Sequence, residues 1–308
     1  MDNIGGLIVA AGDCGAREEI TPLMKLGSVS VIRRIVITLQ LADIQPIVVV
    51  TGYHALEVEQ HLAGYNVIFI RNEDYENTDK LYSTKLGLEY LQDKCDRVVF
   101  TPVTIPLYTA ETVKRLIAAN RKIVVPVHRG KRGHPVLLGT EVIRHILAYN
   151  GNGGLNDALR QLEAVYEYVE VQDKGTVLNA EKIDKWDDVL DINHLTDIHP
   201  FLQIHLQKEN TIFDSRARLL LTLIDEVHSV KGACKYMALS TGKAWVIINE
   251  LEEALGYPVV ARRQGGKAGG KTSLTDKGRI FLDKYRVYEE SVRKEAYDKF
   301  IEIFDEYR

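Results

Sequence analysis

Short runs of apolar, largely β-branched residues alternate with amphipathic helical patterns over the first two thirds of this chain. The apolar runs lie at residues 7–10, 47–51, 67–70, 98–100, 123–126 and 166–171, and the helical patterns lie at residues 28–42, 55–62, 84–92, 109–119, 140–149 and 155–162. Near-continuous apolar strands separated by helices are typical of a parallel sheet covered on both faces. The pattern therefore predicts an open α/β sandwich with a parallel-rich sheet and a ligand site at the carboxyl ends of its strands.

The pattern changes from about Trp186 onward. Residues 201–205 and 211–213 bracket a polar turn like a small hairpin, and a helix with an apolar stripe follows, made of Leu219, Leu220, Leu223, Ile224 and Val227. A short helix over residues 231–238 comes next. Ser240 is then expected to cap a third helix whose buried stripe is Ala244, Ile247, Ile248, Leu251 and Leu255. Two short strands around a glycine-rich tip complete the outline of a winged helix-turn-helix.

The length of 308 residues is enough for two domains, each with its own core. We place them at residues 1–195 and 200–308, with the boundary near residues 195–199. Cys14, Cys95 and Cys234 form neither an even set nor a Cys-x-x-Cys pair, which argues against a disulfide scaffold and a structural zinc site. No apolar stretch approaches the roughly 18 residues that a membrane span needs. The sequence therefore predicts a soluble, cytoplasmic protein without a membrane partner.

The net charge of −4 is unevenly distributed. Residues 1–213 carry 22 Lys and Arg against 28 Asp and Glu, whereas residues 214–308 carry 17 against 15. Within the second part, residues 259–279 contain six basic side chains and a single acid, Asp276. A polyanion responds to this local cluster of positive charge and not to the net charge of the chain, so the second part is a candidate nucleic-acid surface.

Several motifs of the first part follow the ends of predicted strands. Ala10-Ala11-Gly12 closes the first strand, Asn72-Glu73-Asp74-Tyr75 precedes a polar loop and Ser83, Thr104 lies after the fourth strand, and Gly133-His134-Pro135-Val136 belongs to a basic glycine loop. In this order the motifs resemble the MobA-like nucleotidyltransferases, most closely the molybdenum cofactor cytidylyltransferase group, over about residues 4–192. The resemblance implies a Rossmann-like fold and transfer of a nucleotide from CTP or GTP to a phosphorylated pterin, with magnesium.

The chain departs from this family where the family carries its chemistry. The signature Arg, Gly and Lys of the first loop fall on Ala16, Glu18 and Thr21, and the metal-holding Asp falls on Thr104. A hydroxyl is a poor substitute, because carboxylates hold magnesium in phosphoryl-transfer sites. Glu181 is the one candidate metal ligand that the resemblance leaves.

These departures predict that the fold is retained and catalysis is lost. We assign no catalytic residue and expect no required cofactor, with magnesium needed only if nucleotidyl transfer is retained. Backbone amides do not depend on the missing side chains, so binding of a nucleotide or pterin-type ligand is expected to remain. The candidate nucleotide-binding residues are Ala10, Ala11, Gly12, Arg17, Lys25, Ser83, Thr104, Gly133 and His134. For His134, a loop histidine bonded to backbone is an equally good interpretation.

Residues 215–282 resemble the DNA-binding domain of ModE-type regulators. The resemblance is carried by Ser240-Thr241-Gly242-Lys243-Ala244-Trp245, by the basic stretch from Val259 to Lys271, and by Leu274-Thr275-Asp276-Lys277-Gly278. It implies that dimers place a winged helix on double-stranded operator DNA. Gly242, Val246 and Asn249 form the face expected in the major groove, whereas Trp245 is expected to pack inside the domain. The candidate DNA-binding residues are Ser240, Thr241, Lys243, Asn249, Arg262, Arg263, Lys267 and Lys271.

A long terminal helix is expected from Asp276 to Tyr307. Its apolar positions recur three or four residues apart: Phe281, Leu282, Tyr285, Tyr288, Val292, Ala296, Phe300, Ile303, Phe304 and Tyr307. Such a stripe implies a partner, and a second copy of the chain is the simplest one. The sequence thus favours a homodimeric transcription regulator whose degenerate nucleotidyltransferase domain senses a nucleotide or molybdenum-cofactor-related ligand. Two alternatives stay open, an active bifunctional nucleotidyltransferase that also binds DNA and a regulator whose first domain is only structural.

Overall fold

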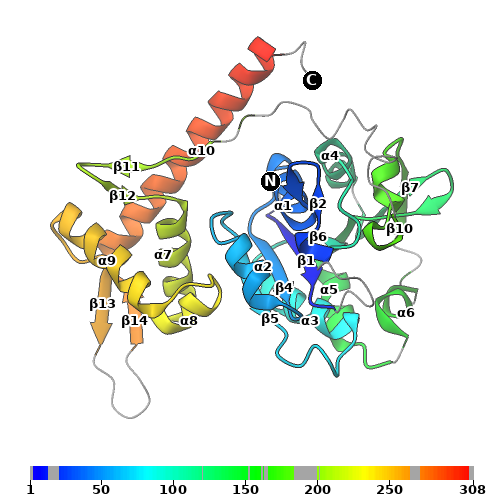
Figure 1. The fold of residues 1–308 in the computed structure, drawn as a ribbon, viewed down its shortest axis with the longest axis horizontal. Helices are drawn as coiled ribbons and strands as arrows, with labels where there is room; N and C mark the ends of the chain where they lie inside the picture. Colours follow the sequence, from blue (N-terminus) through cyan, green and yellow to red (C-terminus); the bar gives the residue numbers. More distant parts are fainter. Residues whose placement is uncertain are drawn as a thin grey trace. The chain divides into compact units, whose positions relative to one another are not determined.

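The computed structural model describes residues 3–12, 21–119, 121–151, 153–160, 162, 166–183, 200, 202–263 and 271–304. The chain divides into two compact units, Met1–Ile192 and Asn193–Arg308 (Figure 1). The domain boundary expected near residues 195–199 lies outside the described residues. Among the described residues, no helix combines the length and the hydropathy that a membrane span requires.

The first unit is built on a mixed sheet with the order β10-β7-β9-β6-β1-β4-β5, and β8 pairs with β7 at its side. The strands are β1 (Ile4–Ala10), β4 (Ile47–Thr51), β5 (Ile68–Arg71), β6 (Arg97–Pro102), β7 (Ile123–His128), β8 (Lys131–Arg132), β9 (Val136–Gly139) and β10 (Tyr166–Glu170). The pairs β1-β4, β1-β6, β4-β5 and β7-β10 are parallel, whereas β8 and β9 are antiparallel to their neighbours. The predicted parallel-rich α/β sheet is therefore confirmed.

Helices cover the two faces of this sheet. They are α1 (Val31–Leu41), α2 (Ala55–His61), α3 (Lys80–Leu91), α4 (Ala110–Ala118), α5 (Thr140–Ala148) and α6 (Gly154–Arg160). In Figure 1, α1 and α4 lie on one side of the sheet and α3, α5 and α6 on the other, in agreement with the contacts within each group. The core between the layers is made of fully buried aliphatic residues such as Leu7, Ile8, Val48, Val49 and Leu88.

Two sequence expectations for this unit are wrong in detail. The third helix begins at Lys80 and not at Thr84, because the Asp79 side chain accepts a hydrogen bond from the Tyr82 amide and so caps a longer helix. The basic glycine loop expected around Gly133 to Val136 runs into β9, whose apolar residues pair with β6 and β7. The pairing with β6 joins segments that α4 and β7 separate in sequence, which local pattern does not reveal.

The second unit has the predicted winged helix-turn-helix order. It contains β11 (Leu206–Gln207), β12 (Thr211–Phe213), α7 (Ser215–Val227), α8 (Val230–Lys235), α9 (Thr241–Leu255), β13 (Val260–Arg263), β14 (Lys271–Leu274) and α10 (Asp276–Phe304). The first hairpin strand lies at β11 and not at residues 201–205. On α7, Leu219 of the expected stripe is only half-buried, whereas Leu221, which the stripe did not include, is buried. On α9, Ala244, Ile248 and Leu251 are buried as expected.

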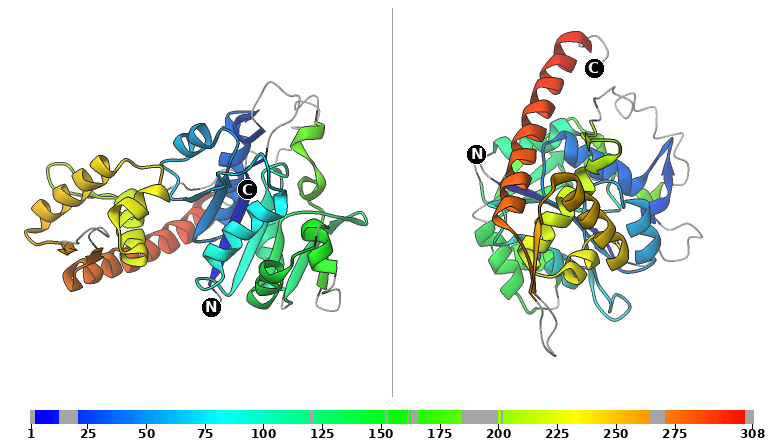
Figure 2. Two further views of the ribbon diagram at one scale, coloured as in Figure 1. Left: turned by 90° about the horizontal axis from the view of Figure 1, so that it is seen from below. Right: turned by 90° about the vertical axis from the view of Figure 1, so that its left-hand side faces the viewer.

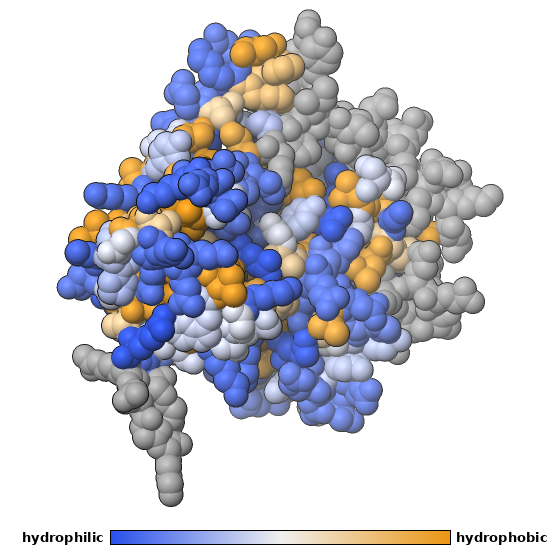
Figure 3. Space-filling view, turned by 60° about the vertical axis from the view of Figure 1, so that its left-hand side comes forward, coloured by the Kyte–Doolittle hydropathy of each residue, from blue (hydrophilic) through white to orange (hydrophobic). Residues whose placement is uncertain are grey.

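Helix α10 packs on the unit only through its first half. Leu282 and Tyr285 are buried, and the Phe213 ring meets Tyr285 edge-on with the ring centroids 4.8 Å apart. Beyond this contact α10 extends away from the rest of its unit (Figure 2), and Ile303 and Phe304 are 63% and 41% exposed. Hydrophobic surface lies at this outer end in Figure 3. The outer half of the helix therefore presents apolar side chains at the surface.

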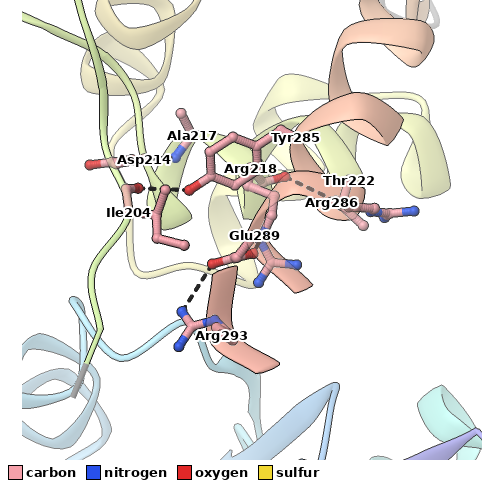
Figure 4. A network of polar contacts seen from close by, with 9 residues as sticks. All are labelled: Ile204, Asp214, Ala217, Arg218, Thr222, Tyr285, Arg286, Glu289 and Arg293. Atoms are coloured by element: carbon pink, nitrogen blue, oxygen red, sulfur yellow. Dashed lines mark hydrogen bonds and ion pairs between the residues drawn. The ribbon is translucent and has the colours of Figure 1, made fainter. Parts of the chain in front are cut away.

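A buried ion pair joins α10 to α7 (Figure 4). Glu289 is 5% exposed, and one of its oxygens lies 3.2 Å from Nε of Arg218, while the other accepts a hydrogen bond from Arg293 at 3.0 Å. Tyr288, a member of the expected apolar stripe, is 51% exposed. The next residue, Glu289, is buried because Arg218 of α7 lies opposite and neutralises its carboxylate.

Candidate functional site

The carboxyl ends of four strands lie side by side at one edge of the sheet in the first unit. Ala10 of β1 pairs with Thr51 of β4, and Thr51 pairs with Arg71 of β5. On the other side of β1, Val9 pairs with Pro102 of β6. We call this edge the carboxyl edge. It is the place where open α/β sheets bind ligands, because loops from several strands meet there.

The loop after β1 starts on small residues at this edge. Ala10 and Ala11 are buried, and the Ala11 carbonyl accepts a hydrogen bond from the Tyr53 amide at 3.1 Å. Gly12 is exposed, and a Cβ atom added to it would meet no other atom within 4 Å. A ligand can therefore approach the backbone at Gly12 without meeting a side chain, as a phosphate-binding loop requires. Ala16, Arg17 and Glu18 lie outside the described residues.

Thr21 and Lys25 differ in their exposure. Thr21, which occupies the position of the family's Lys, is 1% exposed in the 3-10 helix Thr21–Leu23. Lys25 is exposed on β2 (Lys25–Leu26), which forms a two-residue hairpin with β3 (Val29–Ser30). Of the two, Lys25 alone can offer a charge to an anionic ligand.

Ser83 lies below the surface of the neighbouring loop. The side-chain nitrogen Nδ2 of Asn72 donates to Oγ of Ser83 at 3.0 Å and to Oγ1 of Thr78 at 2.8 Å. Asn72 and Ser83 are 2% and 4% exposed. Ser83 thus anchors the loop after β5, a role the sequence did not indicate.

The segment that carries Glu181 is fastened to the loop after β6. Asp173 accepts hydrogen bonds from the Thr109 amide at 2.8 Å, from Oγ1 of Thr112 at 2.6 Å and from the Gly175 amide at 2.9 Å. A Cβ atom on Gly175 would lie 2.0 Å from the Leu107 carbonyl oxygen, so only glycine fits this close approach. The sequence did not indicate Asp173, because its partners Thr109 and Thr112 lie more than 60 residues away.

This fastening brings Thr104 next to Glu181 in the fold. The Ala180 amide donates to the Thr104 carbonyl at 2.7 Å, and the Glu181 amide donates to Oδ1 of Asn179 at 2.8 Å. Within the described residues, no group of three or more His, Cys, Asp and Glu side chains could hold a metal ion. Of the described residues at this place, Thr104 supplies a hydroxyl and Glu181 a carboxylate, so a single carboxylate is present where the resemblance implies two.

Gly133 and His134 also reach the carboxyl edge, where β9 begins. The His134 amide donates to the Thr176 carbonyl at 2.9 Å, and a Cβ atom on Gly133 would lie 2.4 Å from the same oxygen. The His134 ring meets Phe100 edge-on with the centroids 5.7 Å apart, and its Nδ1 is buried without a hydrogen-bond partner. Burial lowers the pKa of His134 to about 4, so the ring is neutral at pH 7. It can donate or accept a hydrogen bond but cannot neutralise a phosphate.

The structure adds a cation at the same edge that the sequence did not single out. Arg71, the last residue of β5, donates from Nε to Oε1 of Glu59 at 3.1 Å and from a terminal nitrogen to Oε2 at 2.5 Å. Glu59 is 3% exposed and also accepts from Oγ1 of Thr51 at 2.8 Å. The hydrogen bond with Glu59 raises the pKa of Arg71 above its usual value. These two hydrogen bonds hold α2, which carries Glu59, against the end of β5.

In the second unit, α9 has the expected cap and exposed face. Oγ of Ser240 accepts a hydrogen bond from the Lys243 amide at 3.3 Å. Thr241, Gly242, Lys243, Val246 and Asn249 are all exposed, and Val246 is 53% exposed. The helix therefore presents one polar and one apolar side chain, Asn249 and Val246, on its exposed face, and the cation Lys243 in its first turn.

The wing strands β13 and β14 pair antiparallel next to α9. The Arg262 guanidinium lies 4.5 Å from the centroid of the Trp245 ring and donates to Oδ1 of Asn249 at 3.0 Å. Lys271 is exposed at the start of β14. Trp245 is half-buried under Arg262, partly as expected. Lys267 and the side chain of Arg263 lie outside the part of the chain that the structure describes.

Solved nucleotidyltransferases share the fold of the first unit. A nucleotidyl transferase from Methanothermobacter thermautotroptrophicus superposes with a TM-score of 0.52 at 22% identity and covers 62% of this chain and 97% of its own. Rv0371c from Mycobacterium tuberculosis H37Rv superposes with a TM-score of 0.51 at 17% identity, covering 61% and 96%. These likenesses show the fold of the unit.

A second similarity concerns a shorter stretch. The Molybdenum transport protein ModE from Azotobacter vinelandii is 40% identical over 76 residues, which are 25% of this chain and 28% of that protein. The chain thus spans little more than a quarter of this relative. The match supports a ModE-type C-terminal region fused to the nucleotidyltransferase-like domain.

The family comparison covers more than half of the chain. The model of the MobA-like NTP transferase domain matches residues 6–165, which include β1 and its Ala-Ala-Gly end, the strands that flank it and the Gly133-His134 loop. Both the sequence motifs and the sheet order of the first unit agree with this match. The chain belongs to the family of proteins with a MobA-like NTP transferase domain.

Proposed function

We propose that this protein is a DNA-binding transcription regulator whose MobA-like domain binds a nucleotide or a molybdenum-cofactor-related ligand without transferring a nucleotide. The observation that carries the proposal is the capped helix α9, with its exposed face beside a basic wing. The similarity to ModE supports the same assignment.

Helix α9 has the properties of a recognition helix. Its first turn offers unpaired backbone amides and Lys243 to phosphates, because the amino end of a helix carries partial positive charge. Val246 and Asn249 lie three residues apart on the exposed side. An apolar side chain can contact the thymine methyl group, and an amide can bond to a base edge.

The wing is expected to supply phosphate contacts. Replacing Lys271 by alanine should weaken binding to every DNA sequence and reduce the slope of log affinity against log salt by about one unit, because one phosphate contact is lost. Fluorescence anisotropy of the full chain with a duplex that carries two half-sites about 10 base pairs apart measures this slope. Lys122→Ala removes the same charge from an exposed position of the first unit and should leave the slope unchanged. Equal slopes in wild type and Lys271→Ala would remove the wing from the interface.

We further propose that the outer half of α10 pairs with a second copy of the chain. Two-fold symmetric operators call for a symmetric dimer. Phe300 and Phe304 stack with centroids 5.3 Å apart, and their replacement by serine should weaken self-association about tenfold or more, because apolar burial is lost. Sedimentation velocity across a concentration series measures the effect. A wild-type chain that stays monomeric at roughly 50 µM, the range of weak interfaces, would contradict the dimer.

Absence of catalysis is the second part of the proposal. Thr21 is buried where the family carries Lys, and Thr104 and Glu181 offer a single carboxylate between them, which supports the absence of catalysis. We expect no pyrophosphate release from CTP or GTP with a phosphorylated pterin and magnesium. Turnover of about one per second would establish the bifunctional enzyme instead.

Ligand binding is tested by thermal shift of the full chain. A ligand that binds only the folded state raises the melting temperature, so CTP, GTP or a pterin should raise it at millimolar concentration, equally with and without magnesium. Failure of all three would favour the alternative in which the first domain is only structural.

A further inference from the structure

Three side chains of α9 and one of the wing form a contact set on the surface of the second unit. Trp245, Asn249 and Glu252 follow one another at helical spacing, and the Arg262 side chain from β13 meets all three. Arg262 donates to Oδ1 of Asn249 at 3.0 Å, stacks on Trp245 at 4.5 Å and lies 3.5 Å from Oε2 of Glu252. The set occupies the border between the helix and the wing.

Arg262 is held in place by this set. The other oxygen of Glu252, Oε1, accepts the backbone amides of Val259 and Val260 at 2.8 Å and 3.0 Å. Glu252 is thereby bonded to the start of the strand that carries Arg262. An ion pair, a stacked ring and a hydrogen bond restrict the guanidinium plane more than any one contact alone, because its donors point in fixed directions.

The chemistry of this contact fixes the orientation of Asn249. Arginine carries donors and no acceptor, so the side of the amide that faces it must be the carbonyl. The NH2 group of Asn249 then points away from Arg262. An asparagine reads adenine with both of its groups, donating to N7 and accepting from N6. With one of its two lone pairs bonded to Arg262, Oδ1 is less available to a base, and the fully available group of Asn249 is the NH2 donor.

We propose that Arg262 is a positioning residue that determines base specificity, holding the Asn249 carbonyl so that its NH2 group reads a base edge that accepts a hydrogen bond. Guanine O6 and N7 and thymine O4 are such edges in the major groove, whereas adenine presents its N7 acceptor beside the N6 donor and is best read by an amide whose carbonyl is also available. This inference rests on the proposed DNA binding through α9. It separates Arg262 from a simple phosphate contact, which would strengthen binding to all sequences alike.

The test is selection from randomised duplexes with the full chain, followed by affinity measurements on the four bases at the position that responds to Asn249. The wild type should prefer guanine or thymine there over adenine by about tenfold. Arg262→Met keeps the side-chain length and removes the donors, so adenine should become equal to or better than the wild-type base. Lys271→Met removes one charge from the wing without touching Asn249 and should lower all affinities while keeping their order.

Two further variants sharpen the outcome. Asn249→Asp keeps the bond to Arg262 but replaces the donor by an acceptor, so the preference should move to cytosine or adenine, which donate from N4 or N6. Arg262→Lys keeps the charge without the planar fork and should give a weaker preference in a folded wing.

These results decide whether Arg262 positions Asn249 or only contacts phosphate. A uniform loss of affinity in Arg262→Met, with the base order unchanged, would make Arg262 a phosphate contact and overturn the positioning role while leaving DNA binding intact. No binding of wild type to any duplex at low salt would overturn the proposed function and this inference with it.

Discussion

Replacing Glu289 by alanine is expected to lower the free energy of unfolding of the C-terminal unit by about 3–5 kcal/mol. The carboxylate is the counter-ion of Arg218, whose side chain is 13% exposed. Burial lowers the pKa of Arg218, which shows that its charge is costly at this place. Without Glu289 the guanidinium would remain buried with no carboxylate beside it, and removal of one partner of a buried pair costs more than the pair contributes.

Urea unfolding of the full chain, with hydrogen exchange followed in α7, measures this loss. Glu290→Ala is the matched control, because Glu290 is the next residue on α10 and is exposed. Arg218→Met combined with Glu289→Leu should recover most of the stability, since two apolar side chains replace the two charges. A loss in Glu289→Ala no larger than that of Glu290→Ala would show that the pair does not join the helices.

Replacing Asp173 by alanine should open the carboxyl edge of the MobA-like domain. Its carboxylate accepts from the amide and hydroxyl of Thr109, the hydroxyl of Thr112 and the amide of Gly175, so four donor groups would lose their acceptor at once. Hydrogen bonds to a charged group contribute about 1.5–3 kcal/mol each and are not additive, which makes a total of about 3 kcal/mol reasonable. Amides of residues 104–112 and 173–181 should exchange about 100-fold faster, as 1.4 kcal/mol corresponds to tenfold.

Hydrogen–deuterium exchange with mass spectrometry resolves these segments within the full chain. Lys174→Ala serves as the control, because Lys174 is the next residue and is exposed. Unchanged exchange in Asp173→Ala would mean that the close approach of Gly175 to Leu107 holds the segment by itself.

Local pattern predicts much of this fold. The six apolar runs all become strands. Those of β1, β4, β6 and β7 are largely buried, and strands buried on both faces read as near-continuous apolar segments, whereas β10 is an edge strand none of whose residues is buried. The cap at Ser240 is equally local, since its hydroxyl reaches an amide three residues away. By contrast, β9 has four residues after a proline and pairs with the nearby β7 on one side and, on the other, with β6, from which α4 and β7 separate it in sequence. The pairing with β6 leaves no periodic trace in the chain.

The candidate sites likewise contain residues that local sequence indicates and residues whose role depends on tertiary contacts. The sequence indicated Gly12, Gly133 and His134, and the fold brings them to the carboxyl edge. It did not indicate Asp173 or the fork between Arg71 and Glu59, because each needs partners brought near by tertiary structure. Ser83, a candidate nucleotide-binding residue, lies in α3 and accepts a hydrogen bond from Nδ2 of Asn72. The bond between Arg262 and Asn249 joins a strand to a helix 13 residues away and was likewise invisible.

The position of β1 in the middle of the sheet has a consequence for how the chain folds as it is made. The first strand to leave the ribosome gains β4 on one side once residue 51 has been added, but gains β6 on the other side only after residue 102. The sheet is complete when β10 ends at residue 170, before the first element of the second unit, β11, has been synthesised. Until residue 102 has been added, β1 has an open edge, which makes nascent chains of about 50–100 residues a target for chaperones. Synthesis therefore completes the sheet of the first unit before the second unit is made.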